Sequence, residues 1–239
     1  SLMKNSYLGF CYDDDVQIEN KLKDLGAVYK KIEKHMLPSY VAKLLADQKI
    51  IGWYQGKSEF GPRALGNRSI LADPRSEKMQ KNLNLKIKFR ESFRPFAPAV
   101  LEEESKNWFN IKNCSPFMLF VAQVKEDKLV DISESDLLLN GFDKLNIKRS
   151  LIPSVTHVDN SARIQTVTKE SNQLFYELIK SFDSITQTPI LLNTSFNVKD
   201  EPIVNPIEDA YSCFLSTDLD YLVCSNFLLK KEDQFDDIN

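Results

Sequence analysis

The sequence IIGWYQGKSEFGPRALGNRS at residues 50–69 joins an apolar stretch to a loop rich in glycine. Its first part, Ile50–Tyr54, has the run of branched and aromatic residues that is typical of a buried strand. Four of the seven glycines of the chain fall between Gly52 and Gly66, and glycine permits tight turns and close approach of a ligand to the backbone. The spacing is neither that of a Walker A loop nor that of a dinucleotide-binding GxGxxG motif. The stretch predicts a strand that leads into a binding loop of another kind.

Segments with helical and with strand periodicity alternate on both sides of this stretch. Apolar residues recur at helical spacing from Lys169 to Phe182, whereas Pro189–Leu192 is a short apolar run of strand length. Further helices are expected at 16–25 and after Ser39, Ser76 and Asn205, and further strands at 116–124 and 221–224. Residues 151–167 are expected to form one or two strands with a turn at Asp159–Asn160. The prolines of residues 93–98 exclude a helix there, and the polar segment 125–150 is expected to be an excursion from the fold. The alternation indicates an α/β fold with a sheet and flanking helices.

The composition excludes several classes of protein. Of the 239 residues 42% are hydrophobic, which is enough for a sizeable core. The longest apolar run, Phe117–Ala122, is far shorter than the roughly 18 residues of a membrane span. Four cysteines stand far apart and there are two histidines, so neither a metal site nor a disulfide framework is expected. No secretion signal is visible, which makes the cytoplasm the expected location, and Ser1 and Leu2 are typical of a cloning remnant.

Charge is unevenly distributed along the chain. The net charge is −3, but residues 52–98 hold ten basic and four acidic side chains, and the last forty residues hold ten acidic ones and two lysines. A basic block beside acidic surface is typical of an anion site, and it is also found on solvated basic faces. The glycine-rich loop inside the basic block favours a bound phosphate or another anion.

Two arginines of the loop are the first candidates for holding this anion. Arg63 and Arg68 carry planar guanidinium groups whose donors match the oxygens of a phosphate or carboxylate. The alternative is that Arg63 pairs with Glu59 and only fixes the turn.

A second group of basic residues follows. If residues 85–90 form a strand, then Lys86, Lys88 and Arg90 face one way and require a counter-anion. The alternative is an edge strand that its lysines protect from aggregation. Arg94 stands just beyond, in the proline-rich stretch.

Two polar stretches later in the chain contribute further candidates. His157 and Arg163 flank a turn, where a single histidine is more often structural than catalytic. Asn193, Ser195 and Asn197 follow a predicted buried strand, where such side chains either bind a ligand or cap the turn. No nucleophile triad or carboxylate pair is present, so an enzyme with these residues would act by holding and neutralising anions.

Several of these stretches together resemble the C-terminal domain of the nodulation-protein and antibiotic O-carbamoyltransferase family. The resemblance extends from Tyr7 to Leu229. It is carried by residues 52–56, 59–75, 93–98, 157–167 and 192–197.

The resemblance implies a YrdC-like α/β fold, a twisted mixed sheet with flanking helices. It divides the chain into a tag remnant and linker arm at 1–15 and the YrdC-like domain at 16–239. Full-length members carry an N-terminal Kae1-like ASKHA domain with an iron-type metal site, which is expected to be absent here together with that metal. Possible homodimers are a further implication.

The resemblance also implies a reaction. Carbamoyl phosphate and ATP, with magnesium, give carbamoyl-adenylate, and the carbamoyl group then passes to a substrate hydroxyl in the Kae1-like domain. It assigns catalytic roles to Lys88, Arg94 and His157. It assigns substrate binding to Arg63, Arg68, Lys88, Arg94, Arg163, Asn193, Ser195 and Asn197.

Two other readings stay open at this point. A YrdC-like module with a basic face could bind RNA, although the net charge of −3 and the lack of aromatic RNA-binding strands disfavour nucleic acid. The chain could also be a non-catalytic half that completes the active site of its partner domain.

Overall fold

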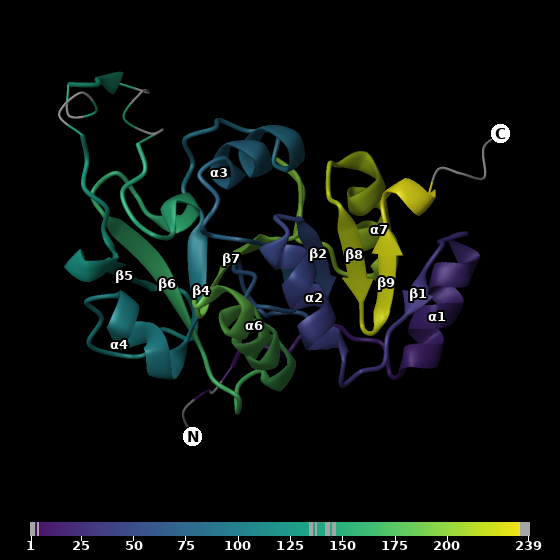
Figure 1. Cartoon of the computed structure of the whole chain (residues 1–239). Helices are drawn as coiled ribbons and strands as arrows, with labels where there is room; N and C mark the ends of the chain where they lie inside the picture. Colours follow the sequence, from purple (N-terminus) through teal and green to yellow (C-terminus); the bar gives the residue numbers. More distant parts are fainter. Residues whose placement is uncertain are drawn as a thin grey trace.

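A mixed sheet of nine strands forms the centre of the protein (Figure 1). The computed structural model describes residues 3, 5–133, 136, 138–141, 144 and 147–234. The spatial order of the strands is β1-β9-β8-β2-β3-β7-β4-β6-β5. The strands are β1 (Lys30–Lys31), β2 (Ile51–Tyr54), β3 (Arg68–Ala72), β4 (Ala97–Leu101), β5 (Phe120–Gln123), β6 (Ser161–Val167), β7 (Ile190–Ser195), β8 (Tyr221–Cys224) and β9 (Phe227–Lys230). β2 is parallel to β8 and β4 to β6, and the other neighbours are antiparallel.

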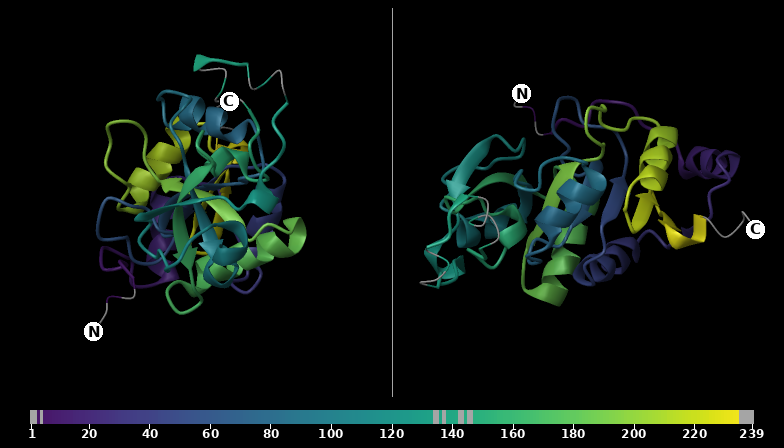
Figure 2. Two further views of the ribbon diagram at one scale, coloured as in Figure 1. Left: turned by 90° about the vertical axis from the view of Figure 1, so that its left-hand side faces the viewer. Right: turned by 90° about the horizontal axis from the view of Figure 1, so that it is seen from above.

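Helices cover both faces of this sheet, so the domain has three layers. The helices are α1 (Asp15–Asp24), α2 (Leu37–Ala46), α3 (Met79–Asn82), α4 (Ser105–Trp108), α6 (Gln173–Thr186) and α7 (Ile207–Ser216). α2 and α6 pack on one face, and α7 lies on the other (Figure 2, right). This architecture confirms the predicted α/β fold with a mixed sheet and flanking helices.

Apolar side chains alternate between the two faces of the sheet along the central strands, so both faces must be covered by helices. Ile51 and Trp53 of β2 point to the α2–α6 layer, whereas Tyr54 belongs to the opposite core with α1, α3 and α7. All four residues of β2 and all five of β3 are buried. Strands that are buried on both faces favour apolar residues, as in Ile51–Tyr54 and in residues 70–72 of β3, although β3 begins with the buried polar residues Arg68 and Ser69.

One segment differs from the sequence-based prediction in a way that matters for function. Residues 85–90 are not a strand, because α3 continues into a π-helical turn at Leu83–Ile87. The predicted row of cations on one strand face is therefore wrong. Lys86 points to solvent and pairs with Asp218 at 3.7 Å, whereas Lys88 is buried.

Smaller corrections concern element ends. Of the one or two strands predicted in 151–167, the structure has β6 alone, since residues 153–155 form a 3₁₀ turn. The predicted turn at Asp159–Asn160 is confirmed and directly precedes β6, with φ of +63° at Asn160. α2 begins at Leu37, with Ser39 donating to the Met36 carbonyl instead of capping the helix. Asn205 does not cap α7, whose N-cap residue is Pro206.

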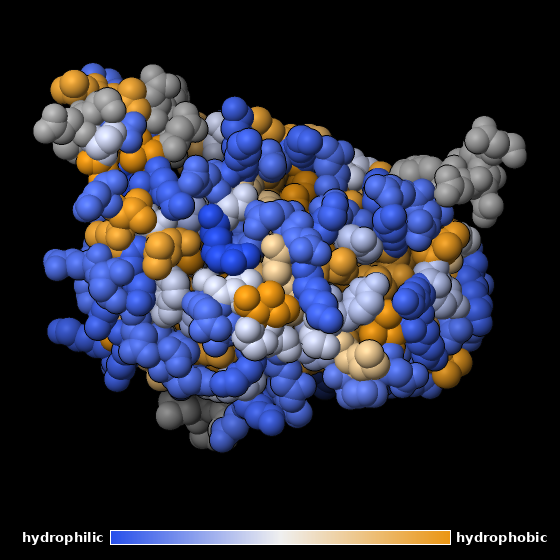
Figure 3. Space-filling view, viewed as in Figure 1, coloured by the Kyte–Doolittle hydropathy of each residue, from blue (hydrophilic) through white to orange (hydrophobic). Residues whose placement is uncertain are grey.

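The segment before α1 lies against the rest of the domain. Tyr7 donates through its hydroxyl to the Leu65 carbonyl at 2.8 Å, and the Gly9 amide donates to the Ser58 carbonyl at 3.0 Å. Residues 5–12 thus run along the glycine-rich loop and help to fix it. On the face shown in Figure 3, hydrophobic residues are scattered in small groups among hydrophilic ones. Among the described residues, no helix has the length and apolar character needed to cross a bilayer.

Candidate anion-binding site

A small pocket opens where β4, β6 and β7 meet the glycine-rich loop. Its volume is about 120 Å³. We call it the arginine pocket. It is lined by Pro62, Arg63, Ala64, Arg90, Pro95, Phe96, Ala97, Met118, Arg163, Asn193, Thr194 and Ser195.

Three arginines from distant parts of the chain reach this pocket. Arg63 comes from the loop, Arg163 from β6, and Arg90 from the stretch after the π-helical turn. The Arg90 guanidinium donates through Nε to Asn84 Oδ1 at 2.7 Å and lies 5.1 Å from the centre of the Phe96 ring. These contacts fix Arg90 and leave its remaining donors for a ligand.

No carboxylate stands among the residues that line the arginine pocket. Arg163 Nε is buried and has no hydrogen-bond partner in the described part of the chain. Burial and the nearby charge of Arg63 lower the pKa of Arg163. Burial and Arg94 lower the pKa of Arg90, and Glu91, which lies outside the pocket lining, opposes that shift. Like charges that converge without an acid are destabilising, so the geometry indicates a site for an anion.

The loop that carries Arg63 is held by Glu59. One oxygen of this carboxylate, Oε1, accepts the backbone N–H groups of Leu65 at 2.7 Å and of Asn67 at 2.8 Å. The alternative that Glu59 pairs with Arg63 is therefore wrong, and Arg63 has no ion pair among the described residues. Gly66 has φ of +110°, and a Cβ there would lie 2.3 Å from the Phe175 ring, so this turn requires glycine.

Asn193 ties the same loop to the sheet. Its Nδ2 donates to Gln165 Oε1 at 2.7 Å and to the Ala64 carbonyl at 3.2 Å, while Gln165 donates to the Leu65 carbonyl at 2.7 Å. Asn193 lines the arginine pocket, and its Oδ1 is buried without a partner among the described groups. This oxygen can accept a hydrogen bond from an amide of a ligand.

Lys88 lies beside the pocket without lining it. Its side chain is 3% exposed, and its ammonium donates to the Ser195 carbonyl, to the Asn197 carbonyl at 2.8 Å and to Asn197 Oδ1 at 2.8 Å. Ser195 Oγ donates to Asn197 Oδ1 at 2.7 Å. Burial and the charge of Arg90 lower the pKa of Lys88 to about 7, and the oxygens around it oppose this shift. Lys88 thus holds the end of β7, which presents Ser195 to the pocket.

Two other predicted residues lie outside the arginine pocket. Arg68 is fully buried, its guanidinium 3.6 Å from the Tyr54 ring centre, and it donates to backbone carbonyls such as that of Gln55 at 2.7 Å. Its place is structural. Arg94 is half-exposed and pairs with Glu91 at 3.0 Å.

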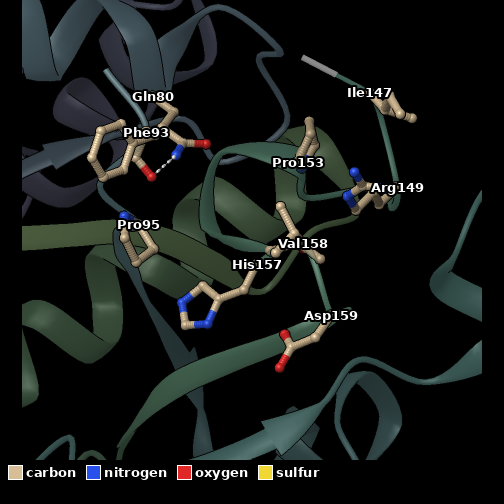
Figure 4. A pocket seen from close by; sticks show the side chains of 10 residues that line it. Gln80, Phe93, Pro95, Ile147, Arg149, Pro153, His157, Val158 and Asp159 are labelled. Carbon is tan, nitrogen blue, oxygen red and sulfur yellow. Dashed lines mark hydrogen bonds between the residues drawn. The ribbon is translucent and has the colours of Figure 1, made fainter. Parts of the chain in front are cut away.

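His157 lines a second pocket next to the first (Figure 4). Its Nδ1 is 3.2 Å from Ser161 Oγ, which donates to Asp159 Oδ1 at 2.7 Å. Because the Ser161 proton points to Asp159, the neutral histidine donates from Nδ1 and keeps a lone pair on Nε2. Burial lowers the pKa of His157, opposed by Asp159 and assisted by Arg163.

Arg90 lines the pocket, but the resemblance does not assign it to substrate binding. It was grouped with Lys86 and Lys88 by strand alternation, and the true π-helical turn separates all three. Asn84, six residues earlier, was the available signal, since a buried amide fixes the Arg90 side chain.

In the part of the chain that the structure describes, no cluster of three or more histidine, cysteine, aspartate or glutamate side chains is placed to hold a metal ion.

Comparison with known proteins identifies the family. Residues 42–231 match the sequence profile described as "Carbamoyltransferase C-terminus". An uncharacterized protein of Synechocystis sp. is 50% identical over 97% of this chain, which covers 38% of that protein. Nodulation protein NolNO of Sinorhizobium fredii is 43% identical over 96% of this chain, which covers 31% of it. The chain thus spans about a third of the length of these relatives.

Among solved structures, full-length HypF in its phosphate- and nucleotide-bound form has a similar fold over part of its length. The match covers 75% of this chain and 20% of the HypF chain, with 16% sequence identity and a TM-score of 0.47. That likeness is too weak to support a conclusion, whereas the profile and the relatives agree along almost the whole chain. The chain belongs to the carbamoyltransferase family and corresponds to its C-terminal domain.

Proposed function

We propose that this chain binds carbamoyl phosphate and ATP and forms carbamoyl-adenylate, as part of an ATP-dependent O-carbamoyltransferase. The carbamoyl group would then pass to a substrate hydroxyl in a partner Kae1-like domain. The observation that carries the proposal is the convergence of Arg63, Arg90 and Arg163 on a pocket whose lining holds no carboxylate.

Size and charge both support a small phosphate compound as the ligand. A volume of about 120 Å³ holds a few heavy atoms, which suits carbamoyl phosphate and is too small for a whole nucleotide. Carbamoyl phosphate is a dianion with an amide at one end. The three guanidinium groups would bind its phosphate, and Asn193 Oδ1 and Ser195 would bind the carbamoyl amide.

The atoms of the reaction balance with one water. Water cleaves carbamoyl phosphate to carbamate and inorganic phosphate, and a carbamate oxygen then displaces pyrophosphate from the α-phosphorus of ATP. Negative charge develops on the phosphoryl oxygens in both steps. Fixed cations around a small pocket stabilise such charge, and each key donor contributes on the order of 10²–10³ in rate. Magnesium would arrive bound to the ATP phosphates, since the pocket lining supplies no carboxylate.

Calorimetric titration of carbamoyl phosphate into the chain tests the proposal. We expect binding by the wild type and a loss of roughly 10- to 100-fold in Arg163→Gln, because a hydrogen bond to a charged group contributes about 1.5–3 kcal/mol. The control is Lys180→Gln, which removes an exposed positive charge on α6, outside the pocket. Thermal unfolding of each variant verifies that it is folded.

Equal binding of carbamoyl phosphate by the wild type and by Arg163→Gln would show that the arginine pocket is not its binding site. Absence of binding by the folded wild type would favour the non-catalytic reading. Salt-sensitive RNA binding that carbamoyl phosphate does not displace would favour the nucleic-acid reading.

A further inference from the structure

The amide of Asn193 is held in one orientation by the groups around it. Its Nδ2 donates to two acceptors, Gln165 Oε1 at 2.7 Å and the Ala64 carbonyl at 3.2 Å. Exchanging Nδ2 with Oδ1 would set an oxygen against the Ala64 carbonyl, which can only accept. The atom left over is Oδ1, which is buried and has no partner among the described groups. Asn193, which lines the arginine pocket, therefore has an acceptor to offer a ligand.

Gln165 determines this orientation from outside the pocket lining. It lies on β6 and is 2% exposed, and its Nε2 donates to the Leu65 carbonyl at 2.7 Å. Because this carbonyl can only accept, the amide nitrogen of Gln165 must face Leu65 and its Oε1 must face Asn193. Gln165 is not among the residues that line the arginine pocket, so its effect on a ligand must be indirect.

The Leu65 carbonyl has a second donor, which comes from the segment before α1. The Tyr7 hydroxyl donates to this carbonyl at 2.8 Å and accepts Nδ2 of Asn172 at 3.1 Å. Asn172 Oδ1 accepts the Phe175 N–H at the start of α6, at 3.1 Å, so this amide is fixed as well. A directed chain of hydrogen bonds thus runs from α6 to Asn193, and Tyr7 holds the carbonyl that orients Gln165.

A buried acceptor without a donor favours ligands that carry an N–H group. Carbamoyl phosphate has an amino group where acetyl phosphate has a methyl group of similar size, and the two share the phosphate that Arg63 and Arg163 would bind. The amino group can donate to Asn193 Oδ1, whereas the methyl group would cover this oxygen and leave it unpaired. A site that hydrogen-bonds its ligand rejects an analogue without the donor far more strongly than an apolar pocket separates two groups of equal size.

We infer that Gln165 is a positioning residue that keeps Asn193 Oδ1 available to the ligand and thereby makes the arginine pocket select a carbamoyl over an acetyl group. This inference rests on the proposed function, because it takes carbamoyl phosphate as the ligand of the pocket. Gln165 acts by restraining Asn193. Without Gln165 Oε1, Asn193 Nδ2 keeps only its contact with the Ala64 carbonyl at 3.2 Å, and the amide can turn.

Replacing Gln165 by methionine tests the inference, since Gln165→Met removes the amide and keeps a side chain of similar length. The matched control is Gln55→Met. Gln55 is 7% exposed, its Nε2 donates to the carbonyls of Val223 at 3.4 Å and Ser225 at 2.9 Å, and it does not line the arginine pocket. Calorimetry with carbamoyl phosphate and, separately, with acetyl phosphate gives the ratio of the two dissociation constants for each protein. Thermal unfolding verifies that each variant is folded.

We expect the wild type to bind carbamoyl phosphate at least about tenfold more tightly than acetyl phosphate, because the methyl group leaves a buried acceptor unpaired. Gln165→Met should reduce this ratio to roughly threefold or less by weakening carbamoyl phosphate, since Asn193 is then free to turn its amide. Gln55→Met should keep the ratio within about twofold of the wild-type value, because its contacts are separate from those of Asn193. A merely structural role for Gln165 would weaken both ligands alike and leave the ratio unchanged.

If Gln165→Met does not fold, Tyr7→Phe takes its place, because it removes the second donor to the Leu65 carbonyl and leaves Gln165 itself present. The control is then Tyr12→Phe, since the Tyr12 hydroxyl donates to Glu208 and accepts the Ile207 N–H, both at 3.2 Å, at the start of α7. Tyr7→Phe should lower the ratio about threefold, and Tyr12→Phe should leave it at the wild-type value.

The wild-type ratio in folded Gln165→Met, or in Tyr7→Phe where that variant takes its place, overturns the inference and leaves the proposed function intact. A wild type that binds the two phosphates equally well also overturns the inference. A wild type that binds neither of them contradicts the proposed function itself, and the inference with it.

Discussion

Two clusters of basic residues in this protein look alike in sequence and differ in structure. In the arginine pocket, Arg63, Arg90 and Arg163 converge where the lining holds no acid. At the other end of the sheet, beside β8 and β9, a second hollow of about 310 Å³ is lined by four lysines and three acidic residues. We call it the paired-lysine cluster. Its pairs are Lys49 with Asp220 at 3.3 Å, Lys86 with Asp218 at 3.7 Å and Lys230 with Glu232 at 2.5 Å.

The difference distinguishes the proposed anion site from a solvated surface. Cations that already have carboxylate partners gain little from a dissolved anion, because the ligand must displace the partner. Cations that face one another without an acid are destabilised until an anion arrives. Local charge density in the sequence therefore does not identify the site, whereas the position of the nearest carboxylate does.

The largest expected effect compares the two clusters directly. The double variant Arg63→Gln with Arg163→Gln should weaken carbamoyl phosphate binding by at least roughly 100-fold, since two charge-assisted contacts at about 1.5–3 kcal/mol each are lost. The double variant Lys49→Gln with Lys230→Gln should change it less than twofold. Calorimetry on both proteins measures the contrast, and a similar loss in the two would mean that general charge and not the pocket binds the ligand.

The sequence predicted much of this arrangement and missed what depends on pairing across space. Strand and helix periods located α6, β2, β7 and β8, because those signals are local. Arg63 and Arg68 could not be told apart, although only Arg63 reaches the pocket. Arg68 does not reach the pocket because the pairing of β2 with β3 places it opposite Tyr54, where its guanidinium lies over the ring. The register between two strands cannot be read from a local sequence pattern.

Lys88 and Arg90 show the second limit. Their alternation with Phe89 suggested a strand, and the tertiary structure imposes a π-helical turn that sends Lys88 into the interior. The resemblance to the carbamoyltransferases assigns Lys88 to catalysis and substrate binding, whereas in the structure Lys88 donates to Ser195 and Asn197 and does not line the arginine pocket.

The pKa of Lys88, beside the arginine pocket, also differs in direction of shift from that of Lys230 in the paired-lysine cluster. Burial lowers the pKa of Lys88 to about 7, whereas the hydrogen bond that Lys230 donates to the Glu232 carboxylate raises the pKa of Lys230. In the unfolded chain Lys88 keeps its ordinary pKa of 10.5, so above pH 7 the unfolded state binds more protons than the folded one. The contribution of Lys88 therefore makes the protein more stable as the pH rises from 7, by at most about 1.4 kcal/mol per pH unit.

We expect this slope to disappear in Lys88→Met and to persist in Lys230→Met. Urea unfolding between pH 7 and 8 measures it, with the thiols, whose ordinary pKa is about 8.5, common to all the proteins compared. Lys88→Met should also lower stability overall, because the oxygens of Ser195 and Asn197 lose their donor. If Lys88→Met leaves the slope of stability against pH unchanged, Lys88 stays charged in the folded protein, among the oxygens that surround it.

The smallest expected effect is a gain in stability when Arg63, a residue of the proposed anion site, is replaced. Arg63 repels Arg163 in the free protein, as the lowered pKa of Arg163 indicates. Arg63→Gln should therefore raise the free energy of unfolding by about 0.5 kcal/mol while it weakens ligand binding, which is the trade-off expected of a site built for an absent anion. Lys49→Gln, which leaves Asp220 without its partner, should instead leave stability equal or lower it slightly.

Salt provides the control for this last comparison. Screening at high ionic strength weakens repulsion between partly exposed charges, so the stability gain of Arg63→Gln should shrink between 50 mM and 500 mM sodium chloride. A phosphate buffer should abolish the gain by filling the pocket of the wild type, because an anion that binds only the folded state stabilises it. If Arg63→Gln is less stable than the wild type in a buffer without phosphate, the arginines of the pocket are not in conflict, and the distinction between the two clusters is lost.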